Sequence, residues 1–452
     1  MLGPGTATAG LIGSGIAAAV LPPSVDPSRL PPNVPPVPLA TELRDPCTET
    51  SPVSDPAPVP APQRTLDLES VWPLTTGRGQ LVAVVDTGVA RHQRLPGLVA
   101  GGDYVSAGDG TEDCDAHGTL VAGIIAAARD DSTGFAGVAP DARILTIRQS
   151  SNIYREVRGG RSAEGRNARG AGDVGTLARA IRRAADLGAS VVNISEVACL
   201  PAGTDDGGTL GAAVDYASRV KDVVLVAAAG NLDSDSCRNS NPPPNPAEPH
   251  ANPWDSVVTV ATPAWYDDQV LTVGSVDPDG RSSPFTVPGP WVDVAAPGTG
   301  ITSLDPRRTR ASDVTDGRNG GTVQGTSFAA PYVAGTVALV RARHPQLTAR
   351  QVMDRIEATA HRPADGWNPY VGHGVVDPLA AVTAETASAP IGPDPSSREL
   401  AITGAVAPQD PRPRTTALFG AIAVGSALGV GLLASFPLRR IRQRAGSDTA
   451  TG

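Results

Sequence analysis

Between residues 63 and 385, short apolar segments alternate with stretches of helical length. The strand-like segments are LVAVV at 81–85, ARILTI at 142–147, SVVNIS at 190–195 and VVLVAAA at 223–229, and the helical stretches lie near 117–129, 173–187, 209–220, 327–343 and 348–359. Apolar strands separated by helices are typical of parallel strands joined by helical crossovers. The alternation therefore predicts an α/β fold in three layers, with a mostly parallel sheet between helices.

The segments around this core differ from it in composition. Residues 21–62 contain 14 prolines and almost no apolar periodicity, so we expect an extended N-terminal arm with polyproline character. Residues 150–172 are polar and rich in Arg and Gly, which predicts a long surface loop and the chain's most accessible site for proteolytic nicking. A Pro- and Asn-rich loop is expected at 238–253, and residues 386–414 are predicted to be a linker.

The C-terminal region has the features of a membrane anchor. Residues 417–436 are 20 uncharged, mostly apolar residues, which is the length that a helix needs to cross the hydrocarbon core. We therefore predict a transmembrane helix at 415–437, followed by a basic tail at 438–452. By the positive-inside rule, the tail is cytoplasmic and the rest of the chain lies on the other side of the membrane. A buried core helix is the alternative, which the Pro- and Arg-rich flanks disfavour.

The N-terminal 20 residues are predicted to be a signal peptide. Their apolar stretch at 6–20 ends in an Ala17-x-Ala19 pattern suited to cleavage. No basic residue precedes this stretch, since the first arginine is Arg29, so the segment lacks the usual positive start and reads as a shortened signal. Export agrees with the topology that the C-terminal helix requires.

Charge and cysteine content narrow the range of partners and sites. The net charge of −9 includes +3 from the last fifteen residues, so the remainder carries −12, which argues against nucleic acid as a partner. The chain has four cysteines, and an even number outside the cytoplasm favours two disulfides. Three pairings are open from the sequence alone. Metal binding is the alternative, but no Cys-x-x-Cys spacing supports it.

Three residues have the types and settings that nucleophilic catalysis requires. Asp86 ends the apolar strand LVAVVD, His117 begins an apolar helix, and Ser327 lies between a Gly-rich turn and another apolar helix. A serine hydroxyl needs a base within hydrogen-bond reach, and that base needs an orienting group. Each residue alone also fits a turn, a surface position or a helix cap. Together, however, they predict an Asp–His–Ser triad.

The segments around these residues resemble the subtilisin-like serine protease family. The resemblance is carried by VVDTGV at 84–89, HGTLVAG at 117–123 and GTSFAAPYVAG at 325–335, in the family's Asp–His–Ser order, and it covers roughly 63–385. It implies a subtilisin-like fold and a serine endopeptidase with Asp86, His117 and Ser327 as its triad. VAAAGN at 226–231 resembles the segment whose asparagine donates to the oxyanion hole, which points to Asn231.

One segment departs from the family pattern. Many subtilases carry Ser-x-Gly-Gly beside the substrate cleft, whereas here Ser195 is followed by Glu196 and Val197. Backbone from this region normally pairs with substrate and lines the pocket beside the cleaved bond. We therefore expect a narrowed or reshaped pocket, restricted specificity and low activity on generic peptides.

Within that family, the chain resembles the mycosins, membrane-anchored subtilases associated with type VII secretion. The signal segment, the Pro-rich arm, the SEVAC segment at 195–199, the four cysteines and the single C-terminal span carry this resemblance. It implies the disulfides Cys47–Cys114 and Cys199–Cys237, and with them an arm that stays attached. It also implies protein substrates and a type VII secretion membrane complex as partners. No cofactor or metal is expected for the chemistry, and no loop suggests a structural Ca²⁺ site.

Two other functions are considered beside proteolysis of secreted or cell-envelope proteins. The chain is alternatively a structural subunit that stabilises the secretion complex independently of catalysis, a role compatible with an intact triad. A general scavenging protease is the third candidate, which the membrane tether and the altered cleft disfavour. In all three cases the expected location is the plasma membrane, with a single span and an extracytoplasmic catalytic domain.

Overall fold

The computed structural model describes residues 20–385 and, beyond them, Ser426 and Leu428. Within 20–385 the undescribed positions are 54–57, 158–169, 205–207, 235, 240, 244, 246, 249–250, 309 and 311–313. The signal peptide expected at 1–20, the linker at 386–414, the transmembrane helix at 415–437 and the basic tail at 438–452 therefore lie almost entirely outside the described residues. Within the described part, no helix combines the length and apolar character that crossing a membrane requires.

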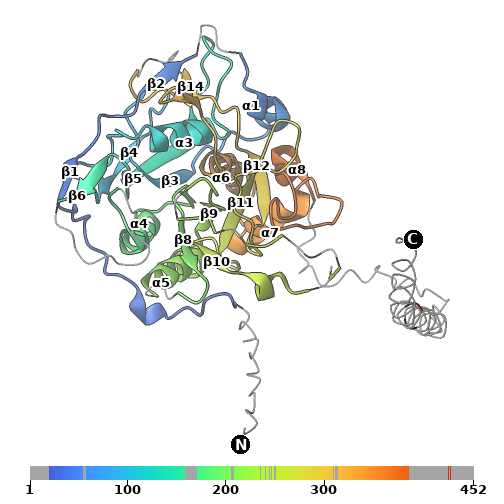
Figure 1. The fold of residues 1–452 in the computed structure, drawn as a ribbon. Coiled ribbons are helices and arrows are strands. Elements are labelled where there is room, and N and C mark those ends of the chain that lie inside the picture. Colours follow the sequence, from blue (N-terminus) through green and yellow to red (C-terminus); the bar gives the residue numbers. More distant parts are fainter. Residues whose placement is uncertain are drawn as a thin grey trace, which may run out of the picture. The chain divides into compact units, whose positions relative to one another are not determined.

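A seven-stranded parallel sheet occupies the centre of the region 63–385, called the core region below (Figure 1). Its strands stand in the order β12-β11-β9-β7-β3-β5-β4. Their bounds are β3 (Leu81–Asp86), β4 (Val99–Asp103), β5 (Arg143–Arg148), β7 (Val191–Ile194), β9 (Val224–Ala228), β11 (Val270–Val276) and β12 (Val294–Pro297). All four predicted strands are present in this sheet, and β4, β11 and β12 are additional to them.

Helices cover both faces of the sheet. Alternate residues of β3 enter different cores: Val82 and Val84 belong to one, and Ala83 and Val85 to the other. The first core is closed by α3 (His117–Ala126) and α6 (Thr326–Arg343), the second by α4 (Val174–Asp186) and α5 (Thr209–Asp215). The predicted three-layer arrangement is therefore confirmed, and β3 carries its last residue, Asp86, to the carboxyl edge of the sheet.

The remaining elements are short or peripheral. The helices are α1 (Ala61–Thr65), α2 (Leu68–Val71), α7 (Ala349–Thr359), α8 (Pro378–Thr383), the 3₁₀ turns Pro27–Arg29 and Pro253–Ser256, and the π-helical turn Tyr216–Val220. The other strands are β1 (Thr41–Leu43), β2 (Thr50–Pro52), β6 (Tyr154–Glu156), β8 (Ala198–Pro201), β10 (Thr259–Thr262), β13 (Ser303–Leu304), β14 (Val314–Arg318) and β15 (Gly321–Thr322). They form small antiparallel sheets.

Local sequence accounts for where the predicted helices begin. Asp173 caps α4 by accepting from the Thr176 amide, while Thr176 Oγ1 accepts from the Asp173 amide; Thr348 and Gln351 form the same reciprocal box at α7. Each box satisfies two amide groups that the first helical turn would otherwise leave unpaired. The predicted ranges at 173–187 and 348–359 therefore match the helices to within one residue at each end.

The N-terminal arm pairs with the core region in two places. Strand β1 pairs with β6, and β2 pairs with β14, both antiparallel, as the blue ribbon along one side of Figure 1 shows. The prediction of loop throughout 150–172 is therefore wrong for β6, which is a strand because the arm supplies its partner. The polyproline prediction for the arm is likewise wrong for β1 and β2. Residues 158–169, where nicking was expected, lie outside the described residues.

Candidate active site

The three predicted catalytic residues come together at the carboxyl edge of the sheet. Asp86 is the last residue of β3, His117 the first of α3 and Ser327 the second of α6. His117 Nδ1 lies 2.7 Å from Asp86 Oδ1, and His117 Nε2 lies 3.0 Å from Ser327 Oγ. Asp86 is fully buried, and the other two residues are largely buried. The chain of two hydrogen bonds has the order that activates a serine nucleophile.

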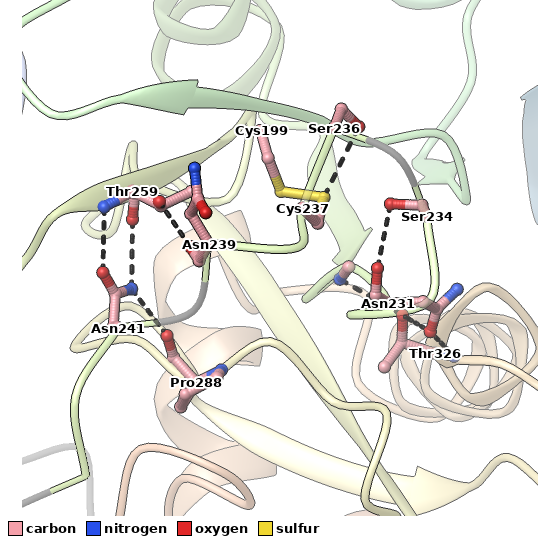
Figure 2. Close-up of a disulfide and its surroundings, with 11 residues drawn as sticks. Cys199, Asn231, Ser234, Ser236, Cys237, Asn239, Asn241, Thr259, Pro288 and Thr326 are labelled. Atoms are coloured by element: carbon pink, nitrogen blue, oxygen red, sulfur yellow. Dashed lines mark hydrogen bonds between the residues drawn. A yellow bond between two sulfur atoms is a disulfide. The ribbon is translucent and has the colours of Figure 1, made fainter.

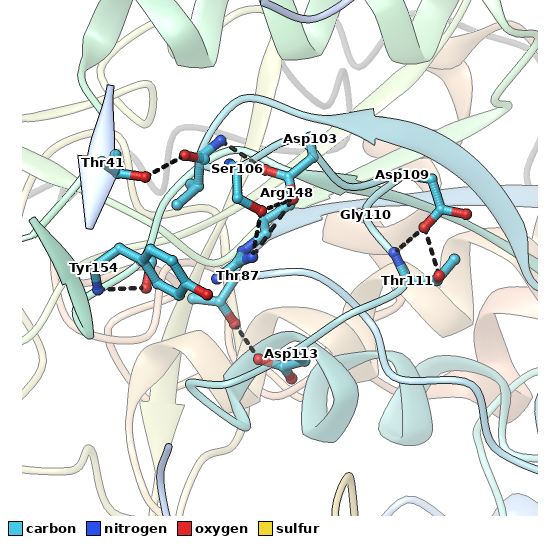
Figure 3. Close-up of polar contacts among 12 residues, drawn as sticks. Thr41, Thr87, Asp103, Ser106, Asp109, Gly110, Thr111, Asp113, Arg148 and Tyr154 are labelled. Atoms are coloured by element: carbon cyan, nitrogen blue, oxygen red, sulfur yellow. Dashed lines mark hydrogen bonds and ion pairs between the residues drawn. The ribbon is translucent and has the colours of Figure 1, made fainter. Parts of the chain in front are cut away.

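A buried carboxyl group joins the strand that carries Asp86 to the helix that carries His117. Asp113 accepts from Thr87 Oγ1 at 2.9 Å and from the Thr119 amide at 2.8 Å, and Thr87 Oγ1 in turn accepts from the Gly118 amide at 3.0 Å (Figure 3 shows the Thr87–Asp113 bond). Burial raises the pKa of Asp113 to about 7 despite these donors. Asp113 was not predicted from the sequence, although it lies four residues before His117 in DCDAHG.

Burial and the Asp86 carboxylate act in opposite directions on His117. Burial lowers the pKa of the imidazole, but the charge and hydrogen bond of Asp86 outweigh it, so the net shift of the His117 pKa is upward. Asp86 Oδ1 also accepts from the Thr87 amide at 2.7 Å, which holds the carboxylate in place. The Phe328 ring lies against His117, with centroids 4.9 Å apart. The histidine is therefore both oriented and stabilised in its protonated form.

Ser327 is positioned by the turn before α6. Gly325 has φ = 143°, a conformation that a residue with a side chain rarely adopts. A Cβ at Gly325 would come within 3.1 Å of Ser327 Oγ and 3.3 Å of Asn231 Nδ2, so both atoms border the space that the glycine leaves open. Ser195 Oγ donates to the Ser327 carbonyl at 2.8 Å, a contact that sequence analysis did not anticipate. The first turn of α6 adds a favourable dipole for negative charge.

The Asn231 amide is oriented by the residue before the serine. Its Oδ1 accepts from the Thr326 amide at 2.9 Å and from Thr326 Oγ1 at 3.0 Å (Figure 2). With the oxygen held by Thr326, the Nδ2 group is the end that faces the space beside Ser327 Oγ. This is the arrangement that an oxyanion donor requires, because the donor must be in place before charge develops.

A cavity of about 600 Å³ opens beside these groups. His117 and Ser327 line it together with Glu196, Val197 and Arg318, so the residues that depart from the family pattern do border the site. Burial, and then the nearby Asp86 carboxylate, raise the pKa of Glu196 to about 7. Restricted specificity remains a prediction, and Glu196 and Val197 on the cavity wall are the side chains that would cause it.

Two disulfides join the four cysteines, and they are the pairs that the resemblance implied. Cys47 of the arm is bonded to Cys114, three residues before His117. Cys199 is bonded to Cys237, and both of these residues line the cavity (Figure 2). One crosslink therefore fixes the segment that leads into α3, and the other ties the strand after Ser195 to the loop after Asn231.

Comparison with known proteins agrees with this geometry. The sequence pattern described as "Subtilase family" matches residues 77–374. Mycosin-4 of Mycobacterium tuberculosis (strain ATCC 25618 / H37Rv) is 50% identical over 425 residues, which is 92% of this chain and 90% of the relative. Thermitase of Thermoactinomyces vulgaris is 34% identical over 71% of this chain and 94% of its own length.

A solved structure of a secretion-system protease has the same fold. It is titled "Structure of a serine protease MycP1, an essential component of the type VII (ESX-1) secretion system"; it is 44% identical with a TM-score of 0.74, and the match covers 81% of this chain and all of that one. The chain therefore belongs to the subtilase family of serine proteases and, within it, to the mycosins.

Proposed function

We propose that this chain cleaves secreted or cell-envelope proteins as part of a type VII secretion system, with Asp86, His117 and Ser327 as its catalytic triad. The observation that carries the proposal is the continuous hydrogen-bond chain from Asp86 through His117 to Ser327 at the edge of an open cavity. The secretion role is supported by the relatedness to the type VII protease MycP1.

In the proposed mechanism, Ser327 Oγ attacks the carbonyl carbon of a peptide bond. His117 Nε2 takes the hydroxyl proton and later gives it to the departing amine, and Asp86 stabilises the imidazolium that forms between these steps. Asn231 Nδ2 and the Ser327 amide receive the oxyanion. Water then enters, loses a proton to His117 and releases the acyl group, which returns Ser327 to its starting state.

The proposed location is the outer side of the plasma membrane, with the chain held by one span at 415–437. The apolar stretch at 417–436 and the arginines after it support this topology. A structure titled "Structure of an intact ESX-5 inner membrane complex, Composite C3 model" contains a chain 40% identical to this one, with a TM-score of 0.76 and coverage of 92% and 99% of the two chains. That match supports a membrane complex as the partner.

The same match favours a second candidate, a structural role in the complex that does not need catalysis. The described arm offers surface for such a role, because Val37 and Leu43 expose 73% and 54% of their area. The two functions are separable, since removal of the nucleophile leaves the protein surface unchanged.

Substitution of Ser327 by alanine separates them. We expect a fluorophosphonate probe to label Ser327 in the purified full-length wild-type chain, and to label neither Ser327→Ala nor His117→Ala. Turnover of a cleaved protein substrate should fall by about 10⁶-fold in Ser327→Ala, as it does when a subtilisin loses its nucleophile. The labelled peptide, identified by mass spectrometry, gives the site of attack.

Protein secretion is then measured in cells that lack the native gene and express either the wild-type chain or Ser327→Ala. A structural role predicts that Ser327→Ala restores secretion fully, whereas a role that depends on proteolysis predicts loss. A folded wild-type chain that takes no label would argue against the triad assignment in the isolated protein. Circular dichroism of each variant provides the folding control.

A further inference from the structure

Asp86, His117 and Glu196 form a cluster at the active site, and each has a side chain of a type that binds metal ions. One ligand atom from each of Asp86, His117 and Glu196 lies within 4.8 Å of the other two. The three residues come from the end of β3, the start of α3 and the segment after β7. The mechanism proposed above uses the first two and has no task for Glu196.

A second observation at this cluster concerns the other oxygen of Asp86. Both hydrogen bonds to this carboxylate, from the Thr87 amide and from His117 Nδ1, are made to Oδ1. Oδ2 is buried and has no hydrogen-bond partner among the described residues. An unpartnered buried carboxylate oxygen is costly, and coordination to a cation is one way of satisfying it.

The charges around the cluster favour a dication. Asp86 and Glu196 bring two carboxyl groups into the cluster, with one oxygen of each within 4.8 Å of the other. Arg318 lines the same cavity and is a positive charge near them. An ion bound between the two carboxylates would remove their mutual repulsion, and the open cavity gives it a path from solvent.

We propose that Asp86, His117 and Glu196 form an inhibitory zinc site in this protease, with the imidazole Nδ1 and one oxygen of each carboxylate as ligands. One imidazole and two carboxylates with an open fourth position form a set that suits Zn²⁺, whereas Mg²⁺ and Ca²⁺ prefer oxygen ligands alone. Ligand atoms of a tetrahedral zinc lie about 3.4 Å apart. Zinc on Nδ1 would thus replace the proton that now joins this nitrogen to Asp86 Oδ1 at 2.7 Å, the unpartnered Oδ2 would become the Asp86 ligand, and Glu196 would move inward.

Inhibition follows from the tautomer of the histidine. A neutral imidazole with zinc on Nδ1 carries its proton on Nε2, the atom that faces Ser327 Oγ at 3.0 Å. That nitrogen then donates and can no longer accept the serine proton, so the nucleophile is not activated. The predicted inhibition rests on the proposed function of the triad. The predicted binding of zinc does not depend on that function.

The first experiment measures the labelling rate of the full-length chain by a fluorophosphonate probe at increasing ZnCl₂. We expect micromolar ZnCl₂ to slow wild-type labelling at least 10-fold, EDTA to restore it, and MgCl₂ or CaCl₂ at the same concentration to have no effect. Glu196→Gln should require at least 10-fold more ZnCl₂ for the same fractional slowing. Glu69→Gln, at an exposed ion pair far along the sequence, is the matched control and should behave as wild type.

The second experiment measures zinc binding without activity, by calorimetric titration of Ser327→Ala with ZnCl₂. One equivalent should bind, and binding should weaken at least 10-fold when either Glu196→Gln or His117→Ala is added. Equal affinity in all three versions, or equal zinc sensitivity of wild type and Glu196→Gln, would overturn the site. Failure of the proposed protease function would look different, because the zinc-free wild type would then take no label while the titration still reported on the site.

Discussion

Asp113 is a residue outside the triad that connects the segments carrying two of its members. Its carboxyl group binds Thr87, the residue after Asp86, and both the amide and the hydroxyl of Thr119, two residues after His117. Complete burial raises the pKa of Asp113 to about 7, because the desolvation cost exceeds what the three donors return. Asp113 therefore holds two segments of the active site together, but its ionised form costs folding free energy because it is buried.

This cost predicts a pH-dependent stability. A carboxyl whose pKa is higher in the folded than in the unfolded state binds more protons when folded, so its contribution is favourable at acid pH and is lost as pH rises toward 7. Between pH 5 and 7, the wild type should lose on the order of 2 kcal/mol of unfolding free energy relative to Asp113→Asn, which cannot ionise. Denaturant melts at the two pH values measure the difference.

Other carboxyl groups also titrate in this range. The test is therefore the difference between the wild type and Asp113→Asn in how unfolding free energy changes with pH. Asp279→Asn, at an exposed carboxylate, is the matched control and should follow the wild type. Parallel pH dependence of the wild type and Asp113→Asn would show that Asp113 has an ordinary pKa in the folded chain.

At the scale of elements, the arm is built into the fold through strands and a crosslink. β1 and β2 each complete a small antiparallel sheet with a strand from the core region, and Cys47–Cys114 joins the stretch between them to the segment before α3. Thr50 Oγ1 also donates to Asp305 at 2.8 Å. An arm held in this way is a structural part of the domain, and we predict that residues 21–62 stay attached in the mature chain.

Removal of the arm's crosslink should therefore destabilise the domain. The loop between Cys47 and Cys114 spans 67 residues, for which the chain-entropy model gives about 4 kcal/mol at 25 °C. We expect the double variant Cys47→Ser/Cys114→Ser to lose about that much unfolding free energy, as measured by denaturant melts. Cys199→Ser/Cys237→Ser, with a separation of 38 residues, is the comparison and should lose a similar amount.

Attachment of the arm is tested separately by N-terminal sequencing of the mature protein. A mature chain that begins near residue 21 agrees with the prediction. One that begins near residue 63 would contradict it and would make the arm a removable segment.

At the scale of the whole molecule, the chain divides into two units, one that ends at Glu385 and one that runs from Thr386 to Gly452. The first unit contains every residue of the proposed site. The second contains the apolar stretch on which the predicted topology depends. The proposed catalytic residues and the predicted membrane span therefore lie in separate parts of the chain, and we expect truncation to separate the two functions.

We expect the full-length chain to remain in the membrane fraction after carbonate extraction, and a chain that ends at residue 385 to be released almost completely. The physical reason is that the apolar side chains at 417–436 leave water for the hydrocarbon core. A chain that lacks only 386–414 is the control and should stay with the membrane. Retention of the truncated chain would place the membrane contact within residues 1–385.

The sequence alone was sufficient for the three-layer class, the strands with continuous apolar runs and the identity of the triad candidates. Those features depend on local composition and short motifs, which can be recognised without knowing the contacts between distant residues. It was not sufficient for β4 and β12, because VAGGD and VAAP contain residues with weak strand preference and become strands only beside β5 and β11.

Only the tertiary structure decided the contacts between distant segments. The β1–β6 and β2–β14 pairs depend on two irregular stretches meeting, and the Asp113 bonds depend on how α3 is set against β3. The position of Glu196 beside Asp86 and His117 is of the same kind. Residue types and spacing determined which groups this chain has for chemistry, whereas the fold, by bringing strand ends and helix starts to one edge of a sheet, decided which of them touch.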